Sequence, residues 1–323
     1  MVHVAFRVRE GRGCIVMEGW GHLGTSPDGR AGMVNALAMS LLWGAISTGE
    51  AEDAKKLIAD GTVVSGVEDS CSKLTLLHHA VRFGNADVVK VLLDSGADLA
   101  ARDSGGRTPL HTAARGVYEE RVKKEDDADV SAEDRLTIAR LLLDAGAEVG
   151  ASALREGEEV GMRSGGSQNG WTPLHMAACN KLHAMATLLL ERGADLMART
   201  GFTQEVPLHF AVGSQLQLHP FPENETMVKI LVGHGADLEA MDRDYFTPLR
   251  SAVFRGHVKM VRLLVGLGAN LEAANLSRHK WPGGLVDYNR STVLHLAVHT
   301  DEPKVAINSP SQPLAPSTLN PKP

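Results

Sequence analysis

Five histidines occupy the same place in a recurring motif, and histidine is the side chain best suited to metal binding or proton transfer near neutral pH. They are His78, His111, His175, His209 and His295. Two other copies of the motif carry Trp43 or Arg250 there, which would break a shared metal site. His78 is followed by a second histidine, but adjacent residues on a helix point in different directions. These histidines are therefore interpreted as structural, with no metal site and no catalytic role.

The other candidate chemistry is equally weak. Asp98, Asp195 and Asp237 recur as turn residues of the same motif, so they do not form a catalytic group of carboxylates. No phosphate-binding loop, nucleophile elbow or His-Glu-x-x-His pattern occurs. We therefore predict a protein that is not an enzyme and uses no cofactor.

Cysteine usage and the N-terminus bear on the cellular compartment. Cys14, Cys71 and Cys179 show no metal-binding or Cys-x-x-Cys spacing and are interpreted as reduced thiols. The N-terminus lacks the continuous apolar core of a secretory signal. We expect a cytoplasmic and/or nuclear protein that is not secreted.

Composition narrows the class of partner. The 323-residue chain has a net charge of −6, so it lacks the basic excess that a nucleic-acid partner would require. No apolar run reaches the roughly 18 residues needed to cross a bilayer, which predicts no membrane insertion. A hydrophobic content of 43% indicates a folded protein.

The segment from Thr172 to Leu196 shows how the motif must fold. Thr172 is a good helix N-cap, and Pro173 fits the first helical position, where no backbone donor is needed. Leu174 lies on the same helical face as the small residue three positions later. A second apolar run before Gly193 predicts a second helix that ends in a left-handed residue. The unit is thus a helix, a short loop, a helix and a turn, and one such pair cannot bury its apolar face alone.

The unit recurs along most of the chain. Taking the threonine position as a marker, units start near residues 40, 75, 108, 172, 206, 247 and 292. Gly96, Gly193 and Gly268 each follow the marker threonine of their unit by 21 positions. A base period near 33 residues, lengthened by insertions, accounts for all the intervals.

This period and the motif Thr-Pro-Leu-His-x-Ala resemble the ankyrin repeat family. The residues that carry the resemblance most clearly are Thr108, Pro109, Leu110, His111, Thr172, Pro173, Leu174, His175, Thr247, Pro248 and Leu249. The resemblance implies an all-α ankyrin-repeat solenoid of about seven helix-turn-helix units, with irregular end units and loop insertions. It also implies that the motif histidine bonds within and between neighbouring repeats.

The repeat pattern divides the chain into three parts: an irregular N-terminal leader at 1–32, a repeat domain at 33–298 and a disordered Pro/Ser-rich tail at 299–323. The insertions at 115–135, 151–170 and 272–290 are interpreted either as solvated spacers or as partner contacts. The final unit lacks a recognisable second helix, so the chain is either complete or ends within a repeat.

In the family, the concave face is the usual binding surface, formed by fingertip residues before each Thr-Pro and by residues late in each first helix. Carried over by position, the resemblance implies partner contacts at Phe83, Arg107, Trp171, Asn180, Phe202, Arg243, Asp244, Phe246, Phe254 and Arg255. Aromatic and arginine side chains are enriched among binding hot spots. The alternative is that some of these aromatics pack into the fold instead.

The sequence therefore favours a non-enzymatic interaction scaffold or adaptor, monomeric by itself, that binds another protein on the concave surface. The alternative is a partner- or substrate-recognition fragment of a larger enzyme or ligase complex, with catalysis elsewhere. A catalytic N-terminal segment is the weakest reading, because about 30 residues cannot form an enzyme core. The sequence does not name the partner.

Overall fold

The computed structural model describes residues 41–59, 73–115, 130–154, 169–213 and 224–271. Residues 41–48 are helical. They are followed by α2 (Ala51–Ala59), α3 (Leu76–Phe83), α4 (Ala86–Asp94), α5 (Pro109–Ala114), α6 (Ala132–Asp144), α7 (Pro173–Cys179), α8 (His183–Glu191), α9 (Pro207–Val212), α10 (Glu225–Gly233), α11 (Pro248–Phe254) and α12 (Val258–Gly266). The predicted leader, the tail, the unit near residue 292 and most of the three insertions lie outside the described residues.

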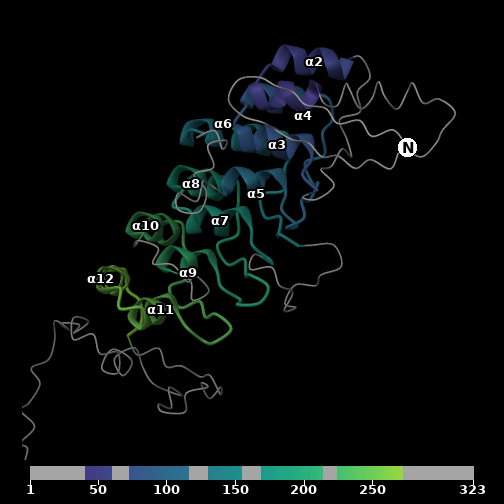
Figure 1. Ribbon diagram of the computed structural model, residues 1–323. Coiled ribbons are helices and arrows are strands. Elements are labelled where there is room, and N and C mark those ends of the chain that lie inside the picture. The colour runs from purple at the N-terminus through teal and green to yellow at the C-terminus, as the bar shows by residue number, and fades with distance from the viewer. Residues whose placement is uncertain (1–40, 60–72, 116–129, 155–168, 214–223, 272–323) are drawn as a thin grey trace, which may run out of the picture.

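The helices form two stacked rows (Figure 1). The first helices of successive units pack in the order α3, α5, α7, α9 and α11, and the second helices pack in the order α2, α4, α6, α8 and α10. Each first helix also packs on the second helix of its own unit. The all-α solenoid predicted from the sequence is confirmed, with six consecutive helix pairs in the described part of the chain.

Each first helix begins where the sequence places its N-cap. The hydroxyls of Thr75, Thr172 and Thr247 accept hydrogen bonds from the backbone N–H three residues later. Proline occupies the first turn of α5, α7, α9 and α11, where its fixed φ costs nothing. Every first helix is therefore short but has a defined start.

Two glycines show how tightly the connections are built. Gly193 follows α8 with a φ of +86°, a left-handed conformation that other residues rarely adopt. Gly170 has a φ of +76°, and a Cβ atom there would lie 2.5 Å from the backbone nitrogen of Gly201. The loops that precede successive first helices therefore approach each other at backbone distance.

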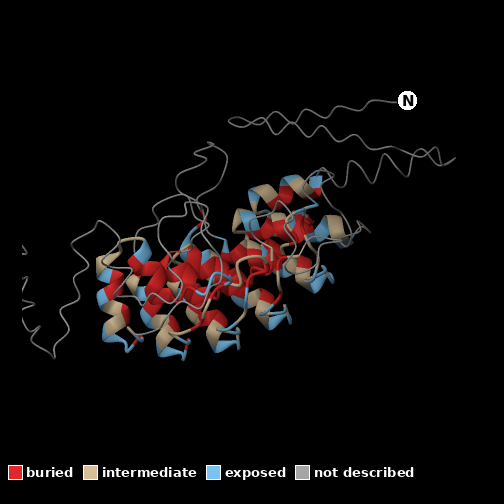
Figure 2. Ribbon diagram, turned by 90° about the horizontal axis from the view of Figure 1, so that it is seen from below, coloured by how far each residue is buried: buried red, intermediate tan, exposed pale blue. Residues whose placement is uncertain are grey.

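The core lies between the two rows of helices, and Figure 2 shows it as a continuous buried zone with the exposed residues on the outer turns. It is made almost entirely of Leu, Ala, Val and Met, and Leu76, Leu142, Leu189 and Leu231 are each fully buried. Fully burying such a side chain contributes about 1.5–3 kcal/mol. Because much of this burial is against the neighbouring unit, each unit depends on the next for its stability.

Candidate functional site

The motif histidines form a ladder of hydrogen bonds between units. The Nε2 atoms of His78, His111, His175 and His209 lie 2.9–3.1 Å from backbone carbonyl oxygens of the next unit. Each acceptor belongs to the residue just before the next N-cap, and the four are Arg107, Trp171, Glu205 and Phe246. The ladder fixes where each loop meets the preceding helix.

The ladder requires neutral imidazoles. In each ring Nδ1 accepts a hydrogen bond from the backbone N–H of its own N-cap residue, as for Thr172 and His175 at 3.1 Å. Nε2 must then carry the proton that is donated to the carbonyl. Burial lowers the pKa of His111, His175 and His209 to about 4. These side chains are thus buried structural donors and are unsuited to proton transfer at neutral pH.

A second set of bonds runs in the opposite direction, from the turn between two helices to the preceding unit. The side chain of Asn85 donates to the carbonyl of Ile46, that of Asn180 to Ala114 (3.4 Å), and His257 bonds to Val212 (3.3 Å). Each of these acceptors lies near the C-terminal end of a first helix. Neighbouring units are therefore joined at both ends of their first helices.

The loops before the first helices, which we call fingers, are also joined to each other. Nη1 of Arg102 donates to the carbonyl of Ser152 in the next finger (2.6 Å), and Arg199 makes the matching bond to Met241 (2.6 Å). The backbone N–H of Arg243 donates to the carbonyl of Thr203 (2.8 Å). The fingers thus form a connected row, and side chains on it are presented with little conformational freedom left to lose.

The structure corrects the sequence-based assignment of Trp171 and Phe246 as partner contacts. Their side chains are only 6% and 3% exposed. Trp171 packs against Phe210 with ring centroids 4.5 Å apart, and Phe246 lies 4.9 Å below the Arg250 guanidinium. Both residues precede an N-cap, and their carbonyls accept hydrogen bonds from the histidine ladder while their rings pack into the core.

Three further residues of the predicted set have structural partners. Phe83 is half-buried at the end of α3 and stacks on His79 at 6.3 Å. Arg107 forms an ion pair with Asp103 at 2.6 Å, and Asn180 donates to the preceding unit. Contact with a partner remains a prediction for these three.

The remaining members of the set gather at one end of the described stack. The Arg243 guanidinium lies 4.5 Å above the Phe202 ring, which joins two adjacent fingers. Phe254, at the end of α11, is 43% exposed and meets Phe246 edge-on at 5.7 Å. Asp244 is exposed and Arg255 is half-exposed. The structure therefore brings finger and helix-end residues onto one surface.

We call this surface the finger face. It includes these exposed or half-exposed residues, which lie before the N-caps or at the ends of the first helices: Lys73, Arg82, Phe83, Ser104, Arg107, Arg115, Lys181, Phe202, Arg243, Asp244, Tyr245, Phe254 and Arg255. Six of these residues are absent from the predicted set of partner contacts: Lys73, Arg82, Ser104, Arg115, Lys181 and Tyr245. Tyr245 is 43% exposed, and Lys181 and Tyr245 have positive φ angles, of 57° and 61°. The position of Tyr245 just before Phe246 was the available signal, since the two must point in different directions.

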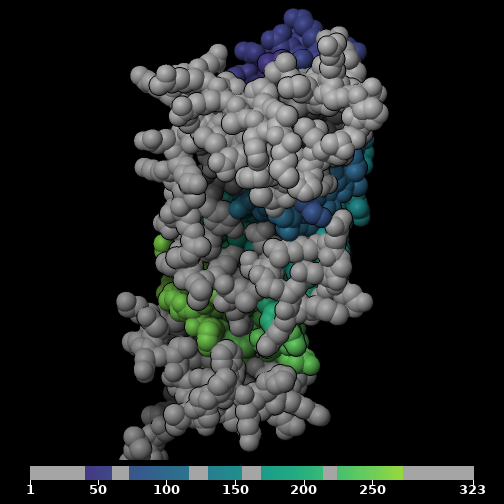
Figure 3. Space-filling model, turned by 45° about the vertical axis from the view of Figure 1, so that its right-hand side comes forward, coloured from purple at the N-terminus to yellow at the C-terminus, as the bar shows by residue number. Residues whose placement is uncertain are grey.

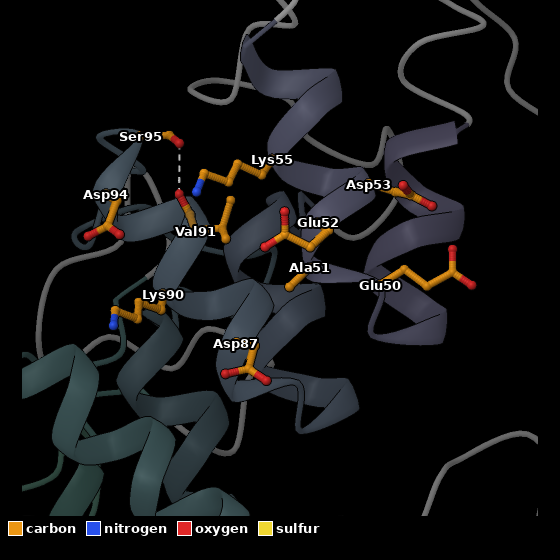
Figure 4. A pocket seen from close by; sticks show the side chains of 10 residues that line it. All are labelled: Glu50, Ala51, Glu52, Asp53, Lys55, Asp87, Lys90, Val91, Asp94 and Ser95. Atoms are coloured by element: carbon orange, nitrogen blue, oxygen red, sulfur yellow. Dashed lines mark hydrogen bonds between the residues drawn. The ribbon is translucent and has the colours of Figure 1, made fainter.

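A groove of about 690 Å³ lies between the second helices α2 and α4 (Figure 4). Carboxylates and lysines line it, and Lys55 extends from α2 toward the end of α4. Its one marked hydrogen bond joins the Ser95 hydroxyl to the Val91 carbonyl at 2.7 Å, within one helix. The lining holds no nucleophile paired with a base, so this groove has the character of a solvated surface.

The described residues offer no other reactive arrangement. In those ranges no three His, Cys, Asp or Glu side chains are placed to hold a metal ion. None of the described helices is both long and apolar enough to cross a bilayer. The finger face is therefore the candidate functional surface of the described residues.

Comparison with known families agrees with this geometry. A model described as "Ankyrin repeats (3 copies)" matches residues 41–153, "Ankyrin repeat" matches 169–201, and "Ankyrin repeats (many copies)" matches 216–265. The chain belongs to the ankyrin repeat family. Such repeats are a protein-interaction fold and are typically non-catalytic.

Curated relatives include the Neurogenic locus Notch protein of Drosophila melanogaster, 36% identical over 28% of this chain and 4% of the relative. Neurogenic locus notch homolog protein 1 of Homo sapiens is 30% identical over 57% of this chain and 7% of its own length. Ankyrin repeat and SOCS box protein 16 of Mus musculus is 30% identical over 51% of this chain and 31% of its own length. The chain thus spans less than a third of each of these relatives.

Two solved structures share the fold. The ankyrin repeat domain of Bcl-3, titled a unique member of the IkappaB protein family, aligns with a TM-score of 0.56 and 25% identity, over 79% of this chain and 92% of that one. The ankyrin repeat domain of human ASB11 aligns with a TM-score of 0.55 and 22% identity, over 82% of this chain and 95% of that one. The second likeness supports the fold alone.

Proposed function

We propose that this protein is a non-enzymatic scaffold or adaptor, of the cytoplasm and/or nucleus, that binds a partner protein on the finger face. The observation that carries the proposal is the row of fingers joined by the Arg102, Arg199 and Arg243 bonds. A surface held in this way loses little conformational entropy when a partner binds. Exposed Tyr245, Phe254 and Arg243 provide the side-chain types that dominate binding energies.

Site-specific photo-crosslinking in cells tests this proposal. A photoreactive phenylalanine analogue replaces Tyr245 in one variant and Lys90 in the control, because Lys90 is exposed on the outer helix α4. We expect a discrete cross-linked protein from position 245 and none from position 90. Cross-links from position 90 alone would move the binding surface to the outer helices and contradict the proposal.

The small share of each curated relative that the chain covers favours a second proposal, in which these repeats are the recognition part of a larger enzyme or ligase complex. An antibody against the described repeats distinguishes the two in native extracts. A denatured species near the 34.5 kDa of this sequence favours the adaptor. A much larger species favours the recognition part of a longer protein.

A further inference from the structure

Charge is distributed unevenly between the two sides of the repeat stack. Among the described residues of the finger face, seven are cationic and one is acidic. The cations are Lys73, Arg82, Arg107, Arg115, Lys181, Arg243 and Arg255, and the acid is Asp244. Arg107 is paired with Asp103 and Arg255 interacts electrostatically with Glu205, while Arg243 is exposed at the end of the described stack.

The second helices show no such bias. Across α2, α4, α6, α8, α10 and α12 there are nine acidic residues and eight basic ones. The whole chain has a net charge of −6. A positive finger face on a negative protein is therefore a local property, and screening at physiological salt confines its effect to distances of about 8 Å.

The shared register of the repeats explains why these cations lie on one side. Arg82, Arg115 and Phe254 each stand seven residues after their N-cap, at the ends of first helices that belong to one stacked row. Phe202 and Arg243 each stand four residues before an N-cap, on adjacent fingers. In the space-filling view the described units follow one another from the purple helices to the green end of the stack, so equivalent positions repeat along its length (Figure 3).

Arg243 is held in position for a ligand. Its guanidinium stacks on Phe202 at 4.5 Å, and its backbone N–H is fixed by Thr203. A stacked arginine remains exposed at its edge, where its N–H groups can meet a carboxylate in a bidentate pair. Such an arginine is oriented before binding, so less rotamer entropy is lost.

The same repeat unit also carries exposed rings. Tyr245, two residues on, and Phe254 are each 43% exposed. Phe254 is oriented by its edge-on contact with the buried Phe246 ring. Apolar rings next to arginines favour a ligand that combines carboxylates with apolar side chains.

We propose that the finger face binds an acidic linear segment of the partner protein, with a carboxylate paired to Arg243 and apolar side chains on Tyr245 and Phe254. This rests on the proposed function and adds the chemistry of the partner. Asp244, the one exposed acid on the face, selects against segments that place a carboxylate beside it.

Selection from a random peptide library on the full-length protein tests this proposal. We expect the enriched peptides to carry several Asp or Glu residues with interspersed apolar residues. Fluorescence anisotropy of a labelled enriched peptide then compares two matched variants, Arg243→Ser on the finger face and Arg262→Ser on α12, which remove the same charge from exposed positions. Unchanged circular dichroism and melting temperature serve as the folding control.

We expect Arg243→Ser to raise the dissociation constant by about tenfold, Arg262→Ser to leave it within about twofold, and Asp244→Asn to lower it. Binding that needs Arg243 but selects peptides without acidic enrichment would overturn this inference and leave the proposed function standing. Equal binding by both arginine variants would contradict the inference and the finger face together.

Discussion

The fingers at Asp103 and at Asp242 share one backbone geometry but hold their carboxylates in different charge states. In both, Oδ1 accepts backbone N–H groups two and four residues later at 2.8–2.9 Å. The residue four positions on is Arg107 in one finger and Phe246 in the other. The turn needs an acceptor, and the following side chain decides whether that acceptor is charged.

The pKa values follow this difference. Burial by itself would raise the pKa of Asp103, but the hydrogen bonds and charge of Arg107 outweigh it and hold the pKa below its ordinary value. Burial raises the pKa of Asp242 to about 7, with further contributions from Glu205 and Asp244. The finger at Asp103 is thus a neutralised ion pair, while the finger before α11 carries an acid that titrates near neutral pH.

The first helices also differ in the buried polar residue that occupies the motif histidine position. His111 and His175 act as buried neutral donors, whereas the equivalent position in the last described unit is Arg250, which is 1% exposed and lies over Phe246. The backbone is constant along the stack while buried polar groups change from unit to unit. The two ends of the described stack should therefore respond differently to changes of pH and to substitutions of these buried groups.

The largest expected effect is the loss of folding stability at low pH. His111, His175 and His209 have folded pKa values of about 4, against about 6.5 when unfolded, so the unfolded chain binds more protons between those values. Their contribution to stability is complete above about pH 6.5 and is lost as the pH falls toward 4. The loss is of the order of 2 kcal/mol for each histidine at about pH 5. Urea unfolding midpoints should fall steeply from pH 7 to pH 5, and a flat profile would contradict the ladder.

Removing one member of the ladder should cost less. His175→Ala leaves the Glu205 carbonyl and the Thr172 N–H without their partner and opens a cavity, so we expect a loss of about 2–4 kcal/mol in the free energy of unfolding. His234→Ala is the matched control at an exposed helix end and should change stability by less than about 0.5 kcal/mol. Similar losses for the two variants would argue against the ladder.

The two aspartates should respond in opposite directions to loss of charge. Asp103→Asn keeps an acceptor but loses the ion pair, and should destabilise by about 1–2 kcal/mol at pH 8. The raised pKa of Asp242 means that its contribution to stability is complete below its unfolded pKa and is lost as the pH rises through about 7. Asp242→Asn should therefore stabilise by about 1–2 kcal/mol at pH 8 and by less at pH 5. Chemical denaturation of both variants at the two pH values provides the measurement. Stability changes of the same sign in both variants would contradict the difference in charge state between Asp103 and Asp242.

The smallest expected change in stability concerns Val206, the one N-cap without a hydroxyl among the first helices α3, α5, α7, α9 and α11. Val206 offers His209 only its backbone N–H, at 3.4 Å, whereas Thr172 adds a hydroxyl 2.8 Å from His175 Nδ1. Val206→Thr should raise the free energy of unfolding by about 0.5–1 kcal/mol. The same denaturation assay measures it, and a destabilised variant would mean that packing of the valine methyl groups outweighs the cap.

The sequence predicts the local parts of this structure well. Caps such as Thr172, first-turn prolines and closing glycines depend on a few neighbouring residues, and their spacing shows where each helix begins and ends. Recurrence of the unit then implies stacking, because a single pair leaves its apolar face exposed. The fold therefore follows from local chemistry and the repeat.

The sequence does not predict which finger residues point outward. The ring of Trp171 packs on Phe210 and that of Phe246 lies under Arg250, while their carbonyls bond to His111 and His209 of the preceding units across 60 and 37 residues. The charge state of Asp242 likewise depends on Glu205 from another finger. Side-chain direction and ionisation are set by neighbours that are distant in the chain.

The most direct measurement of the central claim is hydrogen exchange on the full-length protein, with and without an acidic peptide recovered from the library. We expect added protection at the finger 242–246 and at the end of α11, and no change in α4, which lines the groove between the second helices. Protection of α4 with an unchanged finger would place the binding surface on the outer helices and contradict it.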